Sequence, residues 1–412
     1  MKEQIKVGII GLGGRGNGLL GEILRMKDID VIAVCDLYED RRENAARRVE
    51  ERLGSTPLAT GNYKEILALD EVDAVIVSSS WADHVNVAID AMNAGKYVAT
   101  EVGGAYSVDE CWELVKTYEK THVPCMMLEN CCYGRDELMV LNMVRKGIFG
   151  EIVHCQGGYR HDLRNEITYG RENRHYRLNN YMHRNCENYP THELGPIAKI
   201  LNINRGNRML TLTSMASKAR GLHEYILKNE GPQHDLANYQ FAQGDVVTTT
   251  ILCAHGETIV LTLDTTLPRA YSRGFHVQGT KAMYMEDNNS IFIDGVHNEY
   301  DFNWKAQWNN FEQYREKYEH PLWRNYKPGE DAGHGGMDTL VLMAFFDSVR
   351  RQVQTPIDVY DMASWMSITA LSEQSIAMGG HPVAIPDFTN GKWLNREPEP
   401  EGPYCLSRVY EP

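Results

Sequence analysis

The chain has 412 residues, which is long for one domain and favours two domains with separate hydrophobic cores. It carries 42 lysines and arginines against 56 aspartates and glutamates, for a formal net charge of -14. An acidic surface repels phosphate backbones and anionic lipids, so we expect no nucleic acid and no membrane among its partners. There is no run of eighteen apolar residues and no signal-peptide pattern, which favours a cytoplasmic protein.

The first forty residues predict a dinucleotide-binding turn. Residues 5–10, IKVGII, form a short apolar strand, and GLGGRGNG then leads into an apolar-periodic helix. Gly11, Gly13 and Gly16 fit the spacing G-x-G-x-x-G. Glycines there allow a tight turn and close approach of a pyrophosphate, while the helix start offers free N–H groups to the phosphates.

A second strand over 31–36 ends in Asp36, at the distance where an acidic residue binds the adenosine ribose hydroxyls. A carboxylate there repels a 2′-phosphate, so NAD is favoured over NADP. Arg41 and Arg42 would weaken this preference if they faced the ribose. We expect them instead on a solvated helix face.

Further strands are predicted at 74–78, 96–101 and 123–128, with helices between them. Alternating strands and helices indicate a doubly wound parallel sheet of the Rossmann type, which we assign to residues 1–131. Ligands bind at the carboxyl ends of such strands. This places one set of residues beside the cofactor: Ser80, Trp81, His84, Glu101, Val102 and Asn130. His84 has a structural alternative, as a capping residue at a helix start.

Residues 132–412 are predicted to form an α+β domain with a largely antiparallel open sheet. A helix to about Lys146 stops at Gly147 and leads into an alternating strand. The remaining expected elements are strands at 151–163, 209–217, 246–254, 257–266 and 275–279, and helices at 335–353 and 359–378.

His192 is the most conspicuous titratable residue of this domain. It falls in the first turn of a predicted helix, after Pro190 and Thr191, and Pro196 removes the N–H that would bond to the His192 carbonyl. The positive end of a helix favours a neutral imidazole, which suits a base. The alternative is a core histidine at a kinked helix.

The segment that begins at Arg171 and leads into the helix of His192 is basic and aromatic, and we expect it to be irregular. A cluster that begins just before it comprises Arg164, Arg171, Arg174, Arg177 and Arg184, interleaved with Tyr169, Tyr176 and Tyr181. The arginines fit either a solvated loop or a sugar site, where guanidinium groups bind hydroxyls and aromatic faces stack on the ring. His161, Asp162 and His192 have no spacing typical of a metal site, so no metal is expected.

Seven segments occur here in the order found in the NAD-dependent glycoside hydrolases of family 109, within the Gfo/Idh/MocA oxidoreductase superfamily. They are GLGGRG, CD at 35–36, SWADH at 80–84, TEVGGA, ENCCYG, GGYRHDLR and NYPTHELGPIAKI. The chain resembles that family over most of its length. Ordinary superfamily members carry a lysine, in E-K-P, where this chain has Glu101-Val102-Gly103. The resemblance also implies a homo-oligomer, formed through the outer face of the second-domain sheet.

The resemblance implies glycoside hydrolysis without net redox change. NAD oxidises the C3 hydroxyl of the sugar, a base removes the acidified C2 hydrogen, and the C1 substituent leaves by elimination. Water then adds and the hydride returns to C3. An alternative is an NAD-dependent sugar dehydrogenase or epimerase, and a further one is a sensor without catalytic activity.

Site residues follow from the same resemblance. His192 is implied as base for the C3 hydroxyl, Tyr159 as base at C2 beside an arginine, and Glu129 as a residue that orients the sugar. The implied NAD contacts are Arg15, Gly16, Asp36, Trp81, His84, Glu101, Val102 and Asn130. The implied sugar contacts are Tyr159, Arg177, Tyr189, Pro190, Thr191, His192 and Tyr271.

Arg160 and Glu193 depart from the family pattern. We expect them to change the pocket wall and to favour a different linkage or an acidic sugar over α-linked N-acetylgalactosamine.

Overall fold

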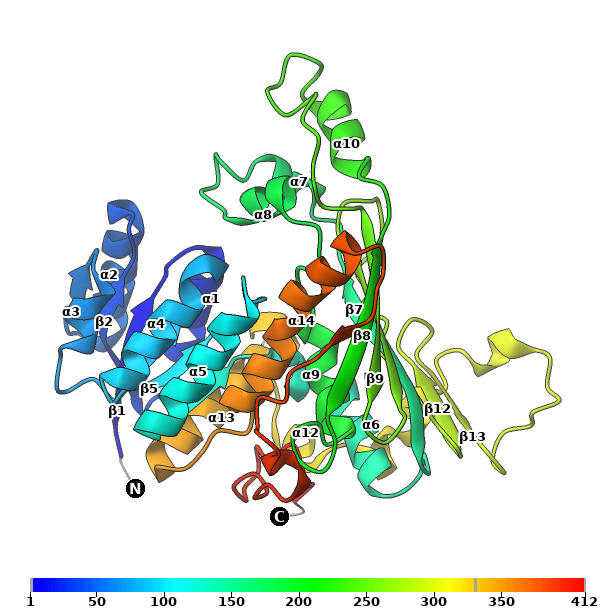
Figure 1. Ribbon diagram of the computed structural model, residues 1–412. Coiled ribbons are helices and arrows are strands. Elements are labelled where there is room, and N and C mark those ends of the chain that lie inside the picture. Colours follow the sequence, from blue (N-terminus) through cyan, green and yellow to red (C-terminus); the bar gives the residue numbers. More distant parts are fainter. Residues whose placement is uncertain (1–2, 330–331, 411–412) are drawn as a thin grey trace. The chain divides into compact units, whose positions relative to one another are not determined.

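The computed structural model describes residues 3–329 and 332–410 (Figure 1). The chain forms two compact units. Unit 1 comprises Met1–Gly134, Pro321–Ala363 and Pro398–Pro412, and unit 2 comprises Arg135–His320 and Ser364–Glu397. The chain therefore returns to the first unit after building most of the second. Among the described residues, no helix is both long and apolar enough to cross a membrane.

Unit 1 is built on a six-stranded parallel sheet in the order β3-β2-β1-β4-β5-β6. Its strands are β1 (Ile5–Ile10), β2 (Ile29–Cys35), β3 (Leu58–Thr60), β4 (Ala74–Val77), β5 (Tyr97–Thr100) and β6 (Cys125–Met127). The strand order reverses between β1 and β4, which is where such sheets bind ligands. The predicted doubly wound sheet is confirmed.

Helices join these strands, and others return from the end of the chain. The first group is α1 (Gly14–Ile23), α2 (Glu39–Leu53), α3 (Tyr63–Leu67), α4 (Trp81–Asn93), α5 (Val108–Thr121) and the 3-10 helix η1 (Asn130–Tyr133). The returning group is α12 (Pro321–Asn325), η4 (Gly333–Gly336) and α13 (Met337–Arg351). Buried Glu22 of α1 holds the returning segment, since its carboxylate accepts from Gly333 N (2.7 Å) and Thr339 Oγ1 (2.8 Å).

Unit 2 contains an eight-stranded sheet in the order β13-β12-β11-β7-β10-β9-β8-β14. Its strands are β7 (Ile152–Arg160), β8 (Met209–Ala216), β9 (Val246–Cys253), β10 (Thr258–Asp264), β11 (His276–Gly279), β12 (Ala282–Met285), β13 (Ser290–Ile293) and β14 (Val383–Ala384). All neighbours are antiparallel except β7 and β10. The largely antiparallel sheet is confirmed.

One face of this sheet is covered and the other is open. Along β9, buried and exposed residues alternate, as a half-covered strand requires. Helix α9 (Thr191–Ile200) packs so closely on β7 that a Cβ added at Gly157 would lie 2.3 Å from Glu193 Cβ. Gly157 therefore allows the approach of α9 to the sheet.

The other helices of unit 2 are mostly short. They are α6 (Arg135–Arg145), α7 (Arg164–Thr168), α8 (Arg177–His183), α10 (Gly221–Asn229), α11 (Arg315–Tyr318), η2 (Trp304–Gln307), η3 (Phe311–Tyr314) and η5 (Lys392–Leu394). Helix α14 (Val359–Ala377) begins in unit 1 and ends in unit 2. The expectation of an irregular segment from Arg171 to the start of α9 is wrong over Arg177–His183, where α8 forms; α7 lies just before that segment. Both helices are too short to give an apolar period in the sequence.

Candidate active site

The glycine-rich turn after β1 has no room for side chains at two of its three glycines. Gly11 has a φ of +91°, and a Cβ there would lie 2.4 Å from Ser79 N. A Cβ at Gly16 would lie 2.0 Å from the carbonyl oxygen of Gly11. At Gly13, by contrast, the nearest atom is Arg41 Nη1 at 3.6 Å, so space remains beside the turn.

Asp36 lies at the carboxyl end of β2 and is tied to this turn. Its carboxylate accepts from Leu12 N (2.6 Å) and Tyr38 N (2.9 Å). Arg42 Nη1 donates to the Asp36 carbonyl (2.9 Å), and Arg41 Nη1 lies 3.8 Å from Asp36 Oδ2. Both arginines lie on α2 as expected and are partly exposed, and both also contact the turn after β2.

His84 and Trp81 fix the loops that follow β4 and β5. Trp81 Nε1 donates to the carbonyl of Val102 (3.0 Å), and His84 Nε2 donates to the carbonyl of Ser79 (3.0 Å). Burial lowers the pKa of His84 to about 4, so the imidazole is neutral. A Cβ at Gly103 would collide with the Trp81 ring, at 2.4 Å from Cδ1.

Three of the predicted cofactor residues, Arg15, Glu101 and Asn130, belong to one hydrogen-bond network. The network also contains Asp338, which could not be predicted from the sequence. Arg15 Nε donates to Glu101 Oε1 (2.8 Å), while its Nη1 and Nη2 donate to the two carboxylate oxygens of Asp338 (2.6 and 3.0 Å). Asn130 Nδ2 also donates to Asp338 (2.7 Å). Burial raises the pKa of Glu101, although Arg15 opposes this.

Glu129 precedes Asn130 and is fully buried. One of its carboxylate oxygens accepts from Cys131 N (3.2 Å), so the side chain caps η1.

In unit 2, five of the predicted sugar residues gather into one aromatic cluster. The Tyr159 ring lies 4.4 Å from Tyr189 and 5.3 Å from His192, measured between ring centroids. Tyr271 is 6.3 Å from Tyr159 and is half exposed, at 51%. The guanidinium of Arg177 lies over the rings of Tyr159 (5.8 Å) and Tyr189 (5.3 Å). The arrangement joins the end of β7, the start of α8 and the start of α9.

His161 is a second residue that the sequence analysis missed as a partner of Tyr159. The Tyr159 hydroxyl and His161 Nδ1 form a hydrogen bond at 2.9 Å. Burial lowers the pKa of His161 and Arg177 lowers it further, which favours the neutral ring; in the tautomer protonated at Nε2, Nδ1 is the acceptor. Spacing i to i+2 on an extended segment places two side chains on one face, and this signal was available in the sequence.

Arg177 stays charged although it is buried. Burial opposes the charge, but Tyr159, Tyr176 and Glu166 outweigh it and hold the pKa of Arg177 above its usual value. Its Nη1 donates to Glu166 Oε1 at 2.7 Å. A fixed cation over a phenol ring stabilises the phenolate form of that phenol.

Three other arginines between 164 and 184 form ion pairs with carboxylates. The pairs are Arg164 with Asp162, Arg171 with Asp235, and Arg184 with Glu373. Of the five arginines in this range, Arg177 is the one shown over the rings of the cluster. Alternation of arginine and tyrosine along a chain does not specify which side chains turn inward.

Arg160 and Glu193 are held away from the cluster. Arg160 follows Tyr159 on β7, so it projects to the other face, where its guanidinium packs against Gly274. Glu193 is fully buried, with Arg273 Nε at 3.3 Å from its Oε1. Glu193 thus faces Arg273 inside unit 2, and its expected effect on the pocket wall stays a prediction.

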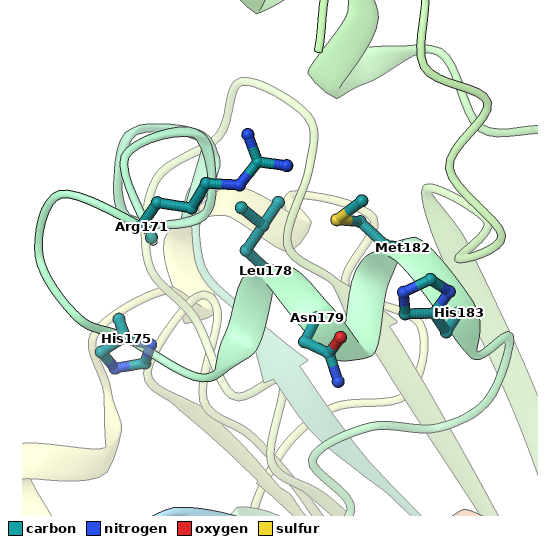
Figure 2. Close-up of a pocket in the computed structure, with 7 residues that line it drawn as sticks. Arg171, His175, Leu178, Asn179, Met182 and His183 are labelled. Carbon is teal, nitrogen blue, oxygen red and sulfur yellow. The ribbon is translucent and has the colours of Figure 1, made fainter. Parts of the chain in front are cut away.

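A pocket of about 310 Å³ lies along α8 (Figure 2). Its lining residues are Gly170, Arg171, His175, Leu178, Asn179, Met182 and His183. None of them belongs to the aromatic cluster. We therefore locate the candidate site by the aromatic cluster.

Two family models match the chain. Residues 5–129 match the oxidoreductase family with an NAD-binding Rossmann fold, and residues 133–395 match the C-terminal domain of glycosyl hydrolase 109. An α-N-acetylgalactosaminidase of Tannerella forsythia is 40% identical, over 96% of this chain and 88% of that protein. A family 109 protein of Stenotrophomonas maltophilia is 41% identical, over 96% and 91%.

Solved structures share the fold at low sequence identity. Levoglucosan dehydrogenase in complex with NADH and levoglucosan has a TM-score of 0.69 at 15% identity, covering 93% of this chain and 100% of that one. Myo-inositol 2-dehydrogenase of Lactobacillus plantarum has a TM-score of 0.65 at 15% identity, with the same coverage. Fold and sequence together define an enzyme, a glycosidase with an NAD-binding domain. The chain belongs to glycosyl hydrolase family 109.

A buried carboxyl lies next to the cluster. Glu187 has no exposed surface, and burial raises its pKa to about 8. The backbone amides of Tyr189 and Leu263 are near enough to lower that pKa partly, but neither makes a hydrogen bond of normal geometry. Leu263 pairs in register with Tyr159, so the Glu187 carboxyl lies beside the backbone that carries two residues of the cluster.

We predict that Glu187→Gln stabilises the protein at pH 8. The folded pKa is about 8 against 4.5 for the free side chain, so ionisation destabilises the fold as pH rises from 4.5 to 8. Wild type then loses at most about 1.4 kcal/mol per pH unit relative to the variant across this window. Melting temperatures of wild type and Glu187→Gln at pH 5, 6.5 and 8 measure this loss of stability. Glu224→Gln, at an exposed glutamate, is the control. A constant difference between wild type and Glu187→Gln at all three values would disprove the assignment.

We also predict that Gly16→Ala destabilises the protein by about 3 kcal/mol or more, because the new Cβ meets backbone that cannot yield. Gly18→Ala in the same helix is the matched control, since a Cβ there has no neighbour within 4 Å. It should be neutral or stabilise by up to about 1 kcal/mol. Thermal unfolding of both variants gives the comparison, and equal melting temperatures would contradict the packing described for the turn.

Proposed function

We propose that this enzyme hydrolyses a glycoside through transient oxidation at C3 of the sugar and proton abstraction at C2, with NAD as cofactor. The observation that carries the proposal is the Tyr159 phenol, which is hydrogen-bonded to His161 Nδ1 and lies beneath the guanidinium of Arg177. The names of the Tannerella and Shewanella relatives, α-N-acetylgalactosaminidases, favour an N-acetylhexosaminide or a related glycoside as substrate.

The residues of unit 1 fit NAD. The turn at Gly11 and Gly16 has no space for side chains, while the space beside Gly13 permits the backbone to approach a pyrophosphate. The carboxylate of Asp36 suits the ribose hydroxyls and opposes a 2′-phosphate. When bound, NAD supplies the hydride acceptor and donor for C3 of the sugar. We assign the cofactor to residues 1–131, through Gly11, Gly13, Arg15, Gly16, Asp36, Trp81, His84, Glu101, Val102 and Asn130.

The sugar is assigned to the cluster of unit 2. His192 takes the proton of the C3 hydroxyl as that carbon becomes a ketone. The Tyr159 oxygen takes the C2 proton, once its own proton has passed to His161 Nδ1. The C2 electron pair forms the double bond to C1 as the bond from C1 to the leaving oxygen breaks. Water then adds at C1, and a proton returns to C2 before C3 is reduced again.

Two features make this proton transfer accessible to a tyrosine. A C3 ketone delocalises the charge that develops at C2, so a modest base suffices. The buried guanidinium of Arg177 lies over the Tyr159 ring and favours the phenolate, whose proton the neutral imidazole of His161 can accept. Tyr189, Pro190, Thr191 and Tyr271 are assigned to binding the sugar, and Glu129 to orienting it.

We predict that Tyr159→Phe lowers kcat by roughly 10²- to 10⁴-fold, which is the usual contribution of a positioned base. The phenylalanine ring keeps the packing against Tyr189 and His192, so bound NAD and melting temperature should be unchanged. Hydrolysis of an aryl α-N-acetylgalactosaminide, with NAD content measured on the same sample, tests this.

Tyr271→Phe is the matched control, because it removes a hydroxyl from the same cluster without touching the proposed base. Its kcat should fall far less than that of Tyr159→Phe. Normal kcat in Tyr159→Phe would remove Tyr159 from the mechanism.

A further inference from the structure

Asp338 connects parts of unit 1 that are far apart in the sequence. Its carboxylate is 4% exposed and accepts from Arg15 at the start of α1 and from Asn130 at the start of η1, which follows β6. His334 Nδ1 lies 2.8 Å from its Oδ2. Burial opposes ionisation of Asp338, but His334 and Arg15 hold its pKa well below the usual value. One buried negative charge thus joins the glycine-rich turn to the last strand of the sheet.

The backbone that delivers Asp338 is constrained. His334, Gly335 and Gly336 are all left-handed, with φ of 48°, 66° and 104°. A left-handed histidine is costly and persists only when its surroundings fix it. Glu22 provides part of that fixation through Gly333 N and Thr339 Oγ1. Two carboxylates therefore hold residues 333–339 in place. Asp338 accepts hydrogen bonds from both Arg15 and Asn130. Glu22 accepts from Gly333 N and Thr339 Oγ1, and these two bonds involve neither Arg15 nor Asn130.

The contacts of Asp338 determine how two proposed cofactor residues are oriented. With Nε on Glu101 and both terminal nitrogens on Asp338, the guanidinium of Arg15 is held in one plane. The Asn130 amide donates its nitrogen to Asp338 (2.7 Å), and its Oδ1 accepts from Cys131 Sγ (3.6 Å). The contact with Asp338 therefore fixes which end of the buried amide is the donor.

We propose that Asp338 is a positioning residue for the dinucleotide: it fixes the rotamer of Arg15 and the amide orientation of Asn130, and thereby sets the affinity for NAD. The inference rests on the proposed function, since it requires NAD as cofactor. Asp338 lies more than three hundred residues beyond the glycine-rich turn and acts through Arg15 and Asn130.

The test is the NAD affinity of the full-length protein, measured by equilibrium dialysis of wild type, Asp338→Asn and Glu22→Gln. Asparagine keeps the shape but loses the charge and one acceptor. Loss of a charged hydrogen bond of this kind predicts a Kd about ten- to a hundredfold higher for Asp338→Asn. Glu22→Gln loosens the same segment without touching Arg15 or Asn130, and its Kd should stay within about threefold of wild type.

Equal losses in the two variants would show that docking of residues 333–339 alone matters, and would overturn the inference. So would an unchanged Kd in Asp338→Asn. If Asp338→Asn does not fold, His334→Ala is the alternative variant, because it removes a partly exposed side chain that contacts Asp338. The Kd of His334→Ala for NAD should rise. An unchanged Kd in that variant would also overturn the inference. If wild type itself does not bind NAD, the proposed function fails instead.

Discussion

The proposed chemistry depends on one hydrogen bond, from the Tyr159 phenol to the neutral imidazole of His161 beside a buried guanidinium. A tyrosine in water holds its proton too tightly to act as a base near neutral pH. Here the imidazole can receive that proton, and the charge on Arg177 stabilises the oxygen that remains. Much of unit 2 serves this arrangement: β7 carries Tyr159, Gly157 allows α9 to approach the sheet, and the start of α9 brings His192 within 5.3 Å of the Tyr159 ring.

In unit 1, the polar groups that follow β5 are engaged in hydrogen bonds. Where ordinary superfamily members carry a lysine after the glutamate of the fifth strand, this chain has Val102, whose carbonyl accepts from Trp81. Glu101 is bound to Arg15 and shares that cation with Asp338. The end of β5 therefore carries no amine for alcohol deprotonation, which is consistent with assigning that proton to His192 in unit 2.

Much of the fold could be predicted from the sequence because its signals are local. Strands such as IKVGII and AVIVS are apolar and β-branched, and the turn between β1 and α1 needs glycine for steric reasons that act within a few residues. His192 could be placed at a helix start for the same reason. The short strands β12, β13 and β14 gave no clear pattern, since two to four residues do not establish a period.

The parts of the site that were missed depend on contacts between distant residues. Asp338 meets Asn130 across 208 positions, and nothing near it in the sequence marks it as a partner of the glycine-rich turn. The arginines between 164 and 184 look alike in the sequence, yet only Arg177 lies over the phenol rings, while Arg164, Arg171 and Arg184 each pair with a carboxylate. Which arginine turns inward is decided by α7 and α8, which the sequence did not reveal.

The most direct test of the central claim is hydrolysis of aryl glycosides in D₂O, with the product sugar analysed by mass spectrometry and NADH followed by absorbance. We predict deuterium at C2 of the released sugar and no accumulation of NADH, because C2 is deprotonated and the hydride returns to C3. Hydrolysis with hydrogen retained at C2 would contradict it. A keto-sugar formed together with stoichiometric NADH would identify a dehydrogenase instead.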